Sequence, residues 1–167
     1  MLKRLLLCCC LFWGTLSAPV FAGASQPPVT SVKVVKRSVS IPSDKTHRCP
    51  KWEPLMKKVG LEPIEVFSYL AWRESRCTPK AVGWNYRKGK SVKDCKLMPY
   101  DAYRKCPAVK SYDSGLWQVN SSWKTVTAQV CKSPQGDMTV LFDPVCNAKV
   151  AKYLLDNGGF NHWSLKR

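Results

Sequence analysis

Apolar side chains recur at intervals of three and four residues in three segments of the chain, and this spacing predicts three amphipathic helices. The segments are residues 50–59, 63–76 and 144–157. Gly60 is a typical stop for the first helix, and Pro63 is favourable at the first position of the second. Each helix is expected to turn one apolar face toward a shared core.

The last predicted helix has capping signals at both ends. Asp143-Pro144 is an N-cap and first-turn pair, and Asn157-Gly158-Gly159 is a typical C-terminal stop. The inward face should consist of Val150, Ala151, Leu154 and Leu155. This helix is therefore predicted to pack its aliphatic stripe on the core.

The second predicted helix carries a carboxylate where its apolar face should continue. At about 100° per residue, four apolar residues fall in one arc: Ile64, Phe67, Leu70 and Ala71. On the opposite side lie Glu65, Tyr69 and Arg73. Glu74 falls between Phe67 and Leu70, where desolvation would raise its pKa and keep a proton to donate near neutral pH. The alternative is an ion pair at the helix end with Arg73 or Arg76.

The segment from Lys80 to Lys110 has no such period and is strongly basic. It holds nine basic residues against Asp94 and Asp101, together with two glycines and two prolines. We therefore predict a long surface excursion, held at its base by Cys95 and Cys106.

The N-terminal part has the order of a secretory signal peptide. Lys3 and Arg4 precede an apolar stretch that ends in small residues, and cleavage after Ala22 or Ala24 fits this order. We predict that residues 1–22 are a signal peptide, which implies a secreted, periplasmic or cell-wall-associated protein. Residues 23–48 are then a basic linker containing Ser and Pro, and residues 49–167 form the folded catalytic domain.

Composition narrows the class of protein. The chain of 167 residues suits one domain, and 45% hydrophobic residues are too many for an intrinsically disordered protein. Lys and Arg number 27 against 11 acidic residues, a net charge of +16, and removing residues 1–22 leaves 25 against 11, or +14. Of this, +7 lies in residues 80–110, which favours an anionic cell envelope as a partner.

Six cysteines remain after the predicted cleavage, and an even number in a small exported domain favours three disulfides. They are Cys49, Cys77, Cys95, Cys106, Cys131 and Cys146. Six cysteines allow 15 connectivities. Proximity favours Cys95 with Cys106 and Cys131 with Cys146, which leaves Cys49 for Cys77.

Three motifs, taken in order, resemble a known superfamily. Ser111 to Trp123 resembles the β-hairpin segment of c-type lysozymes, and Glu74-Ser75 resembles the Glu-Ser step that ends a helix in lysozymes and lytic transglycosylases. The run from Leu141 to Pro144, followed by Asn147, Ala148, Ala151 and Leu155, is similar to the late helix of soluble lytic transglycosylases. The resemblance implies an α+β, mainly α, lysozyme-like fold with a small β-hairpin around residues 113–123 and an active-site cleft beside the helix that ends near Glu74.

The same resemblance implies a site. Glu74 matches the general acid that acts on a β-1,4 glycosidic bond of peptidoglycan, and Asp113 matches the second carboxylate of c-type lysozymes. Four further positions match substrate-contacting ones: Ser75, Gln118, Asn120 and Trp123. No cofactor and no metal are expected. The sequence departs from both family patterns. Asp113 follows Glu74 by 39 positions, which is longer than the spacing in c-type lysozymes, and Ala151 and Leu154 stand where the transglycosylase pattern has Gly and Tyr.

Several functions stay open on the sequence alone. A lytic transglycosylase that uses Glu74 is the first, and a hydrolytic muramidase that uses Glu74 and Asp113 is its alternative. Two others are a secreted ribonuclease that uses His47 and His162 and a non-catalytic cationic protein that binds walls or kills bacteria. The expected partners are peptidoglycan glycan strands and the anionic envelope, without nucleic acid, and we expect a monomer.

Overall fold

The computed structural model describes residues 41–42, 44–95 and 105–165. The chain divides into two compact units, Met1–Val35 and Lys36–Arg167, and every described residue belongs to the second unit. The predicted signal peptide, the linker before residue 41 and the middle of the basic excursion lie outside the described residues. Within the described part, no helix has the length and apolar character needed to cross a membrane.

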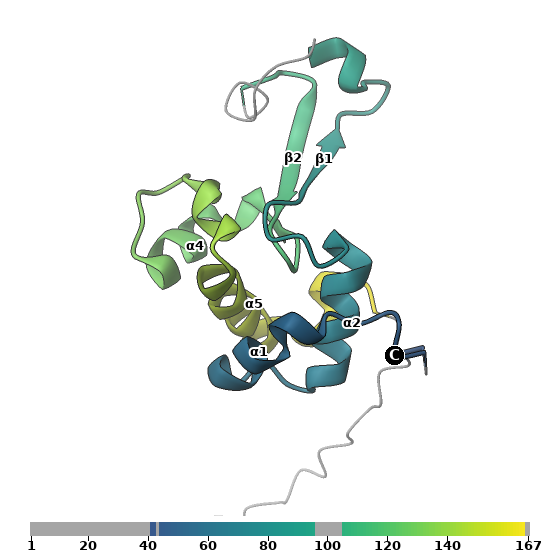
Figure 1. Cartoon of the computed structure of the whole chain (residues 1–167). Helices are drawn as coiled ribbons and strands as arrows, with labels where there is room; N and C mark the ends of the chain where they lie inside the picture. The colour runs from purple at the N-terminus through teal and green to yellow at the C-terminus, as the bar shows by residue number, and fades with distance from the viewer. Residues whose placement is uncertain (1–40, 43, 96–104, 166–167) are drawn as a thin grey trace, which may run out of the picture. The chain divides into compact units, whose positions relative to one another are not determined.

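Among the described residues, four α-helices and several short 3₁₀ helices together make up about half of the fold (Figure 1). The α-helices are α1 (Glu53–Val59), α2 (Ile64–Ser75), α4 (Lys124–Cys131) and α5 (Pro144–Gly158). The three predicted helices are α1, α2 and α5. The first one starts as a short 3₁₀ turn, Pro50–Trp52, and Pro63 is the N-cap of α2 instead of its first residue.

The predicted helix ends agree with the local geometry. Gly60 closes α1 with a left-handed φ of 71°, a conformation that favours glycine. The side chain of Asp143 accepts a hydrogen bond from the backbone N–H of Val145, so it caps the first turn of α5. Gly159 follows as the C-cap of α5. These capping and stop signals act within a few residues, so the sequence alone was enough to identify them.

A three-stranded antiparallel sheet stands beside the helices, in the order β1 (Val82–Tyr86), β2 (Val109–Ser114) and β3 (Val119–Asn120). β1 and β2 run side by side in Figure 1 and pair over most of their length. The predicted α+β, mainly α fold is confirmed. The residue range predicted for the hairpin, 113–123, was too narrow. It contains only the end of β2 and the short β3, and Trp123 lies in a 3₁₀ helix.

The strand that sequence reasoning missed is β1, which begins inside the predicted surface excursion. Val82, Trp84 and Tyr86 alternate with smaller or polar residues and are half-buried, as expected for one face of a strand. Trp84 packs on Tyr112 of β2, with ring centroids 5.7 Å apart. The basic residues that follow Tyr86 obscured this short alternation of apolar and polar positions in the sequence.

Trp117 is the centre of the core between α2 and the C-terminal segment. Its side chain is fully buried, and its Nε1 donates to the backbone carbonyl of Phe67 at 3.0 Å. Its own carbonyl accepts from Nε1 of Trp163 at 2.9 Å. Trp163 lies in η5 (Gly159–Trp163), and its ring packs edge-on against Phe67 at 5.4 Å. One tryptophan therefore fixes η5 against α2.

The turn between β2 and β3 is pressed tightly onto α5. Gly115 has a left-handed φ of 83°, and a Cβ at this position would collide with the carbonyl of Leu141 and the side-chain amide of Asn147. Asn147 is fully buried. Its Oδ1 accepts from the N–H of Trp117 at 2.9 Å, and its Nδ2 donates to the carbonyl of Ser114 at 3.1 Å. One asparagine on α5 therefore holds both ends of the turn.

Three disulfides are present, and they follow the pairing favoured by proximity: Cys49–Cys77, Cys95–Cys106 and Cys131–Cys146. The first joins the chain before α1 to the end of α2, and the last joins α4 to α5. A loop of about 15 residues closed in this way contributes roughly 3 kcal/mol in the chain-entropy model. The covalent links therefore brace the helices that carry the sheet.

Residues just before Cys49 pack on α2, although the predicted domain boundary places them in the linker. The ring of His47 lies 3.9 Å from that of Trp72, and the Arg48 guanidinium lies over Tyr69 at 5.8 Å. Nδ1 of His47 lies 3.5 Å from Oδ2 of Asp44. The ordered contacts of α2 thus extend to residue 44 of the chain.

Candidate active site

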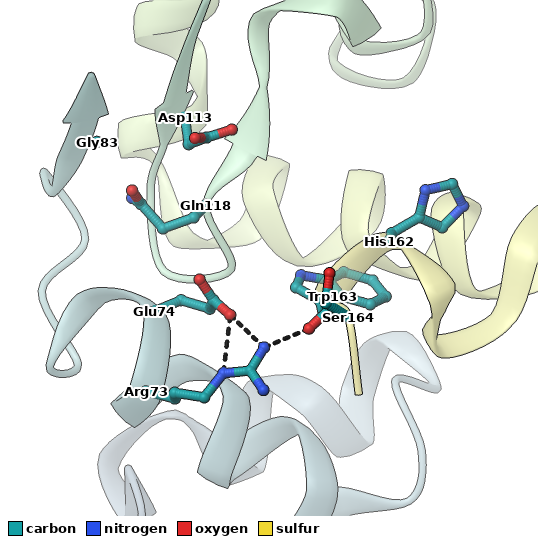
Figure 2. A pocket seen from close by; sticks show the side chains of 8 residues that line it. All are labelled: Arg73, Glu74, Gly83, Asp113, Gln118, His162, Trp163 and Ser164. Carbon is teal, nitrogen blue, oxygen red and sulfur yellow. Dashed lines mark hydrogen bonds and ion pairs between the residues drawn. The ribbon is translucent and has the colours of Figure 1, made fainter. Parts of the chain in front are cut away.

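A cavity of about 400 Å³ opens between the end of α2, the sheet and η5 (Figure 2). It is lined by Arg73, Glu74, Gly83, Asp113, Gln118, His162, Trp163 and Ser164. These residues come from four separate parts of the chain. The cleft predicted between the hairpin and the Glu74 helix is therefore present, and the C-terminal segment forms a third wall.

Glu74 lies in the last turn of α2, and its side chain is 26% exposed. Its Oε1 accepts a hydrogen bond from Nε of Arg73 at 3.0 Å and a second from Nη2 of the same guanidinium. The prediction that Glu74 has apolar surroundings, made from the helix arc, is thus wrong. The last turn of α2 extends past the core and faces the cavity. The ion pair with Arg73, which was the alternative interpretation, is the one observed.

Asp113 lies on β2 and lines the same cavity as Glu74. Its carboxylate accepts from the amide of Asn85 at 2.7 Å and from the amide of Asn120 at 2.8 Å. Asp113 follows Glu74 by 39 positions in sequence, yet both residues line one cavity. The reason is that β1 pairs with β2, which returns the chain to the cavity. Two amide donors hold the Asp113 carboxylate in a fixed orientation.

Gln118 occupies the turn before β3 with a left-handed φ of 47°. Its Nε2 donates to the carbonyls of Ala81 at 3.1 Å and Gly115 at 2.8 Å, which uses both amide hydrogens within the chain. Its Oε1 is the group left for a ligand in the cavity. This oxygen lies beside Gly83, where an added Cβ would be only 2.9 Å from it.

The comparison with known families adds the deciding observation. The family model described as the transglycosylase SLT domain matches residues 52–162, which include α1 through η5 and every wall of the cavity except Trp163 and Ser164. The chain belongs to the transglycosylase SLT domain family. Members of this family are lytic transglycosylases, a kind of glycosidase that acts on peptidoglycan. No curated protein and no solved structure matches the chain in the corresponding comparisons.

Within this SLT domain, three predicted substrate-contacting residues do not line the cavity. The Ser75 hydroxyl is buried and donates to the Ala71 carbonyl at 2.8 Å. Asn120 donates to Asp113 and accepts from the N–H of Ser122, so it holds the carboxylate and caps the next turn. Trp123 packs edge-on against His162 at 5.3 Å and contributes to the wall behind that histidine. In this geometry Ser75 and Asn120 lie outside the cavity lining, and their hydrogen bonds stabilise the elements that form it.

The structure brings Arg73, His162 and Trp163 into the site, and sequence reasoning did not place them there. Arg73 was expected on the solvent face of α2, but its long side chain bends over the helix end and donates to the carbonyl of Trp163. His162 was considered only for a ribonuclease. The C-terminal residues have no local motif, so their position depends on the packing of Trp163 on Trp117.

Among the described residues, no group of three or more His, Cys, Asp or Glu side chains lies close enough to hold a metal ion. The polar side chains at the cavity include two carboxylates, one guanidinium, one amide, one imidazole and one hydroxyl. Such groups can donate and accept protons and can bind sugar hydroxyls. The arrangement of the SLT domain is therefore suited to acid–base chemistry on a neutral carbohydrate bond.

Gly83→Ala is expected to reduce glycan cleavage about tenfold with little loss of stability, because a small misplacement in a site has a large effect on rate. The new Cβ would push the Gln118 amide, which two carbonyls hold from the other side. Cleavage rate and melting temperature measure the two effects. In a Gln118→Ala background, adding Gly83→Ala should change the rate no further. An equal additional loss there would contradict this explanation.

Proposed function

We propose that the protein is a lytic transglycosylase that cleaves the β-1,4 bond between N-acetylmuramic acid and N-acetylglucosamine, with Glu74 as its general acid. The observation that carries the proposal is the position of Glu74, partly exposed in a cavity that Asp113 and Gln118 line from the other side. Membership of the SLT domain family supplies the substrate class. Glu74 is the carboxyl group of α2 at that cavity, and within the described residues it is held at Oε1.

The proposed reaction needs one group that moves a proton in both directions. Protonated Glu74 donates to the glycosidic oxygen while the bond from that oxygen to the anomeric carbon breaks, and the N-acetylglucosamine hydroxyl leaves. The C6 hydroxyl of the muramic residue then attacks the cationic anomeric carbon. Its proton passes to the Glu74 carboxylate, which restores the acid. The product is a 1,6-anhydro sugar, and no water is consumed.

A muramidase is the second candidate, and the shared cavity of Asp113 and Glu74 favours it. Hydrolysis would use the Asp113 carboxylate to balance positive charge at the anomeric carbon while a water molecule attacks. The amides of Asn85 and Asn120 hold that carboxylate in place. The same two bonds also suit a purely structural role at the β1–β2–β3 junction, so Asp113 does not decide between the routes.

Mass spectrometry of digested peptidoglycan tests the proposal, because anhydro ends and reducing ends differ by one water. The purified protein is expected to release muropeptides that end in 1,6-anhydromuramic acid. Asp113→Asn should leave the anhydro product unchanged, since the intramolecular attack needs no second carboxylate. Products with reducing ends, lost in Asp113→Asn, would replace the transglycosylase by the muramidase.

The ribonuclease hypothesis has no geometric support among the described residues. Two histidines that share one phosphate must face the same site, yet His162 lines the cavity while the ring of His47 packs on Trp72 and is absent from the cavity. The cationic binding hypothesis is compatible with catalysis. It replaces the enzyme only if the lytic titre is unaffected by Glu74→Gln.

We also infer that the protein acts outside the cytoplasm, on its predicted partner, the anionic envelope. Three disulfides in a domain of this size are typical of an oxidising compartment. The net charge of +14 that follows the predicted removal of residues 1–22 would hold the enzyme near anionic wall polymers. Fractionation of cells that express the full chain tests the location.

A further inference from the structure

Arg73 and Glu74 are neighbours in sequence, and their side chains nevertheless meet at the cavity. Consecutive residues of an α-helix point about 100° apart, so adjacent side chains do not normally face each other. Here the guanidinium bends over the end of α2 and places both Nε and Nη2 on Oε1 of Glu74. The other carboxylate oxygen points away from Arg73, toward the part of the cavity that Gln118 and Asp113 line (Figure 2).

We propose that Arg73 is a positioning residue for the acid, an inference that rests on the proposed role of Glu74. By holding Oε1, the guanidinium fixes the rotation of the carboxyl group, so that the proton is carried on the oxygen that faces the sugar. The two hydrogen bonds to Oε1 come from Nε and Nη2, which the planar guanidinium holds in a fixed geometry. A lysine ammonium supplies the charge without this geometry.

The guanidinium is itself anchored to the core. Nη2 also donates to the backbone carbonyl of Trp163. Trp163 is buried, its Nε1 is bonded to the carbonyl of Trp117, and its ring packs on Phe67. The orientation of the acid is thus linked through Arg73 to the buried contacts of Trp163 with Trp117 and Phe67, and the C-terminal segment becomes part of the proposed catalytic geometry.

Arg73 is the arginine among the residues that line the cavity, and the other charged or titratable groups there are Glu74, Asp113 from β2 and His162 from η5. Loss of the guanidinium removes both donors at Oε1 and leaves the carboxyl group free to rotate. The rate at saturating substrate should therefore fall, while binding of the glycan should change less.

The test compares Arg73→Gln, Arg73→Lys and Arg76→Gln on soluble, uncrosslinked glycan strands. Arg73→Gln should lower kcat about 10- to 100-fold and change KM less than about twofold. Arg73→Lys should also lower kcat, because the ammonium group keeps the charge but lacks the two fixed donors. Arg76 is the matched control, since it is exposed, lies over Trp72 at 3.9 Å and is absent from the cavity; its variant should keep both values.

Rates are normalised to the folded fraction, measured by circular dichroism. A wild-type kcat for Arg73→Gln would overturn the proposal, and so would a lower melting temperature with no change in kcat. A wild-type kcat in Arg73→Lys would overturn it as well, and this variant decides the question if Arg73→Gln does not fold. Failure of the proposed function is seen separately, as full cleavage by Glu74→Gln.

Discussion

Replacing Glu74 by Gln is expected to lower the rate of peptidoglycan cleavage by about 10²- to 10⁴-fold, the usual contribution of a general acid. The amide keeps the size of the side chain and an oxygen for Arg73 to bind, but it has no proton acidic enough for the leaving oxygen. Release of soluble muropeptides from purified sacculi measures the rate. The substitution acts on the chemical step, so binding to sacculi should persist.

Glu65→Gln is the matched control. Glu65 lies in the first turn of the same helix, is exposed and is absent from the cavity around Glu74. Its variant should cleave at the wild-type rate. Both variants should remain folded, because the partly exposed pair of Glu74 with Arg73 contributes at most about 1 kcal/mol. Cleavage by Glu74→Gln at more than half the wild-type rate would contradict the proposed acid. An unaffected lytic titre on bacteria without cleavage would favour a cationic protein that acts by binding alone.

Helix positions were predictable because their signals lie within a few residues of each other. Gly60 ends α1 and Asp143 caps α5 through bonds to neighbouring backbone groups. Two disulfides follow a similar principle, since Cys95–Cys106 and Cys131–Cys146 join cysteines 11 and 15 positions apart, and Cys49–Cys77 is the pair that then remains. Local chemistry of this kind needs no knowledge of the rest of the fold.

Strand β1 was not predictable in the same way. Its five residues interrupt a basic segment, and what makes them a strand is pairing with β2, about 30 positions later. Gly83 shows the consequence for the site. As a residue in sequence it is one of several glycines, but in the sheet it pairs with Asp113 and lies against Gln118. Pairing across such a distance has no local signal.

Glu74, the proposed acid, was predicted to face the cleft, but its predicted surroundings were wrong. A helix wheel treats the whole of α2 as facing the core, yet Glu74 lies one residue before the end of the helix, where the cavity begins. The charged partner of Glu74 was named as an alternative, and Arg73 is that partner. The third wall of the site, with His162 and Trp163, depends on tertiary packing alone.

Asn147→Asp is expected to destabilise the fold by about 3 kcal/mol, a large part of the 5–15 kcal/mol typical of a domain. The carboxylate can still accept from the N–H of Trp117, but it cannot donate to the carbonyl of Ser114, and it is charged in a fully buried position. The turn that Asn147 holds carries Gln118 and follows Asp113. Cleavage should therefore fall together with stability. Urea denaturation with the disulfides intact measures the loss.

The pH dependence of this loss distinguishes the lost donor from a simple packing defect. Burial raises the pKa of a carboxyl group introduced at position 147 above its value in the unfolded chain, so the folded state takes up a proton as pH falls and the deficit shrinks. The protonated group can again donate to Ser114. Asn157→Asp, an exposed change in the same helix, should cost about 0.5 kcal/mol or less. Equal urea midpoints for the two variants at pH 7, or a deficit in Asn147→Asp that does not shrink at pH 4, would contradict the role given to the buried amide.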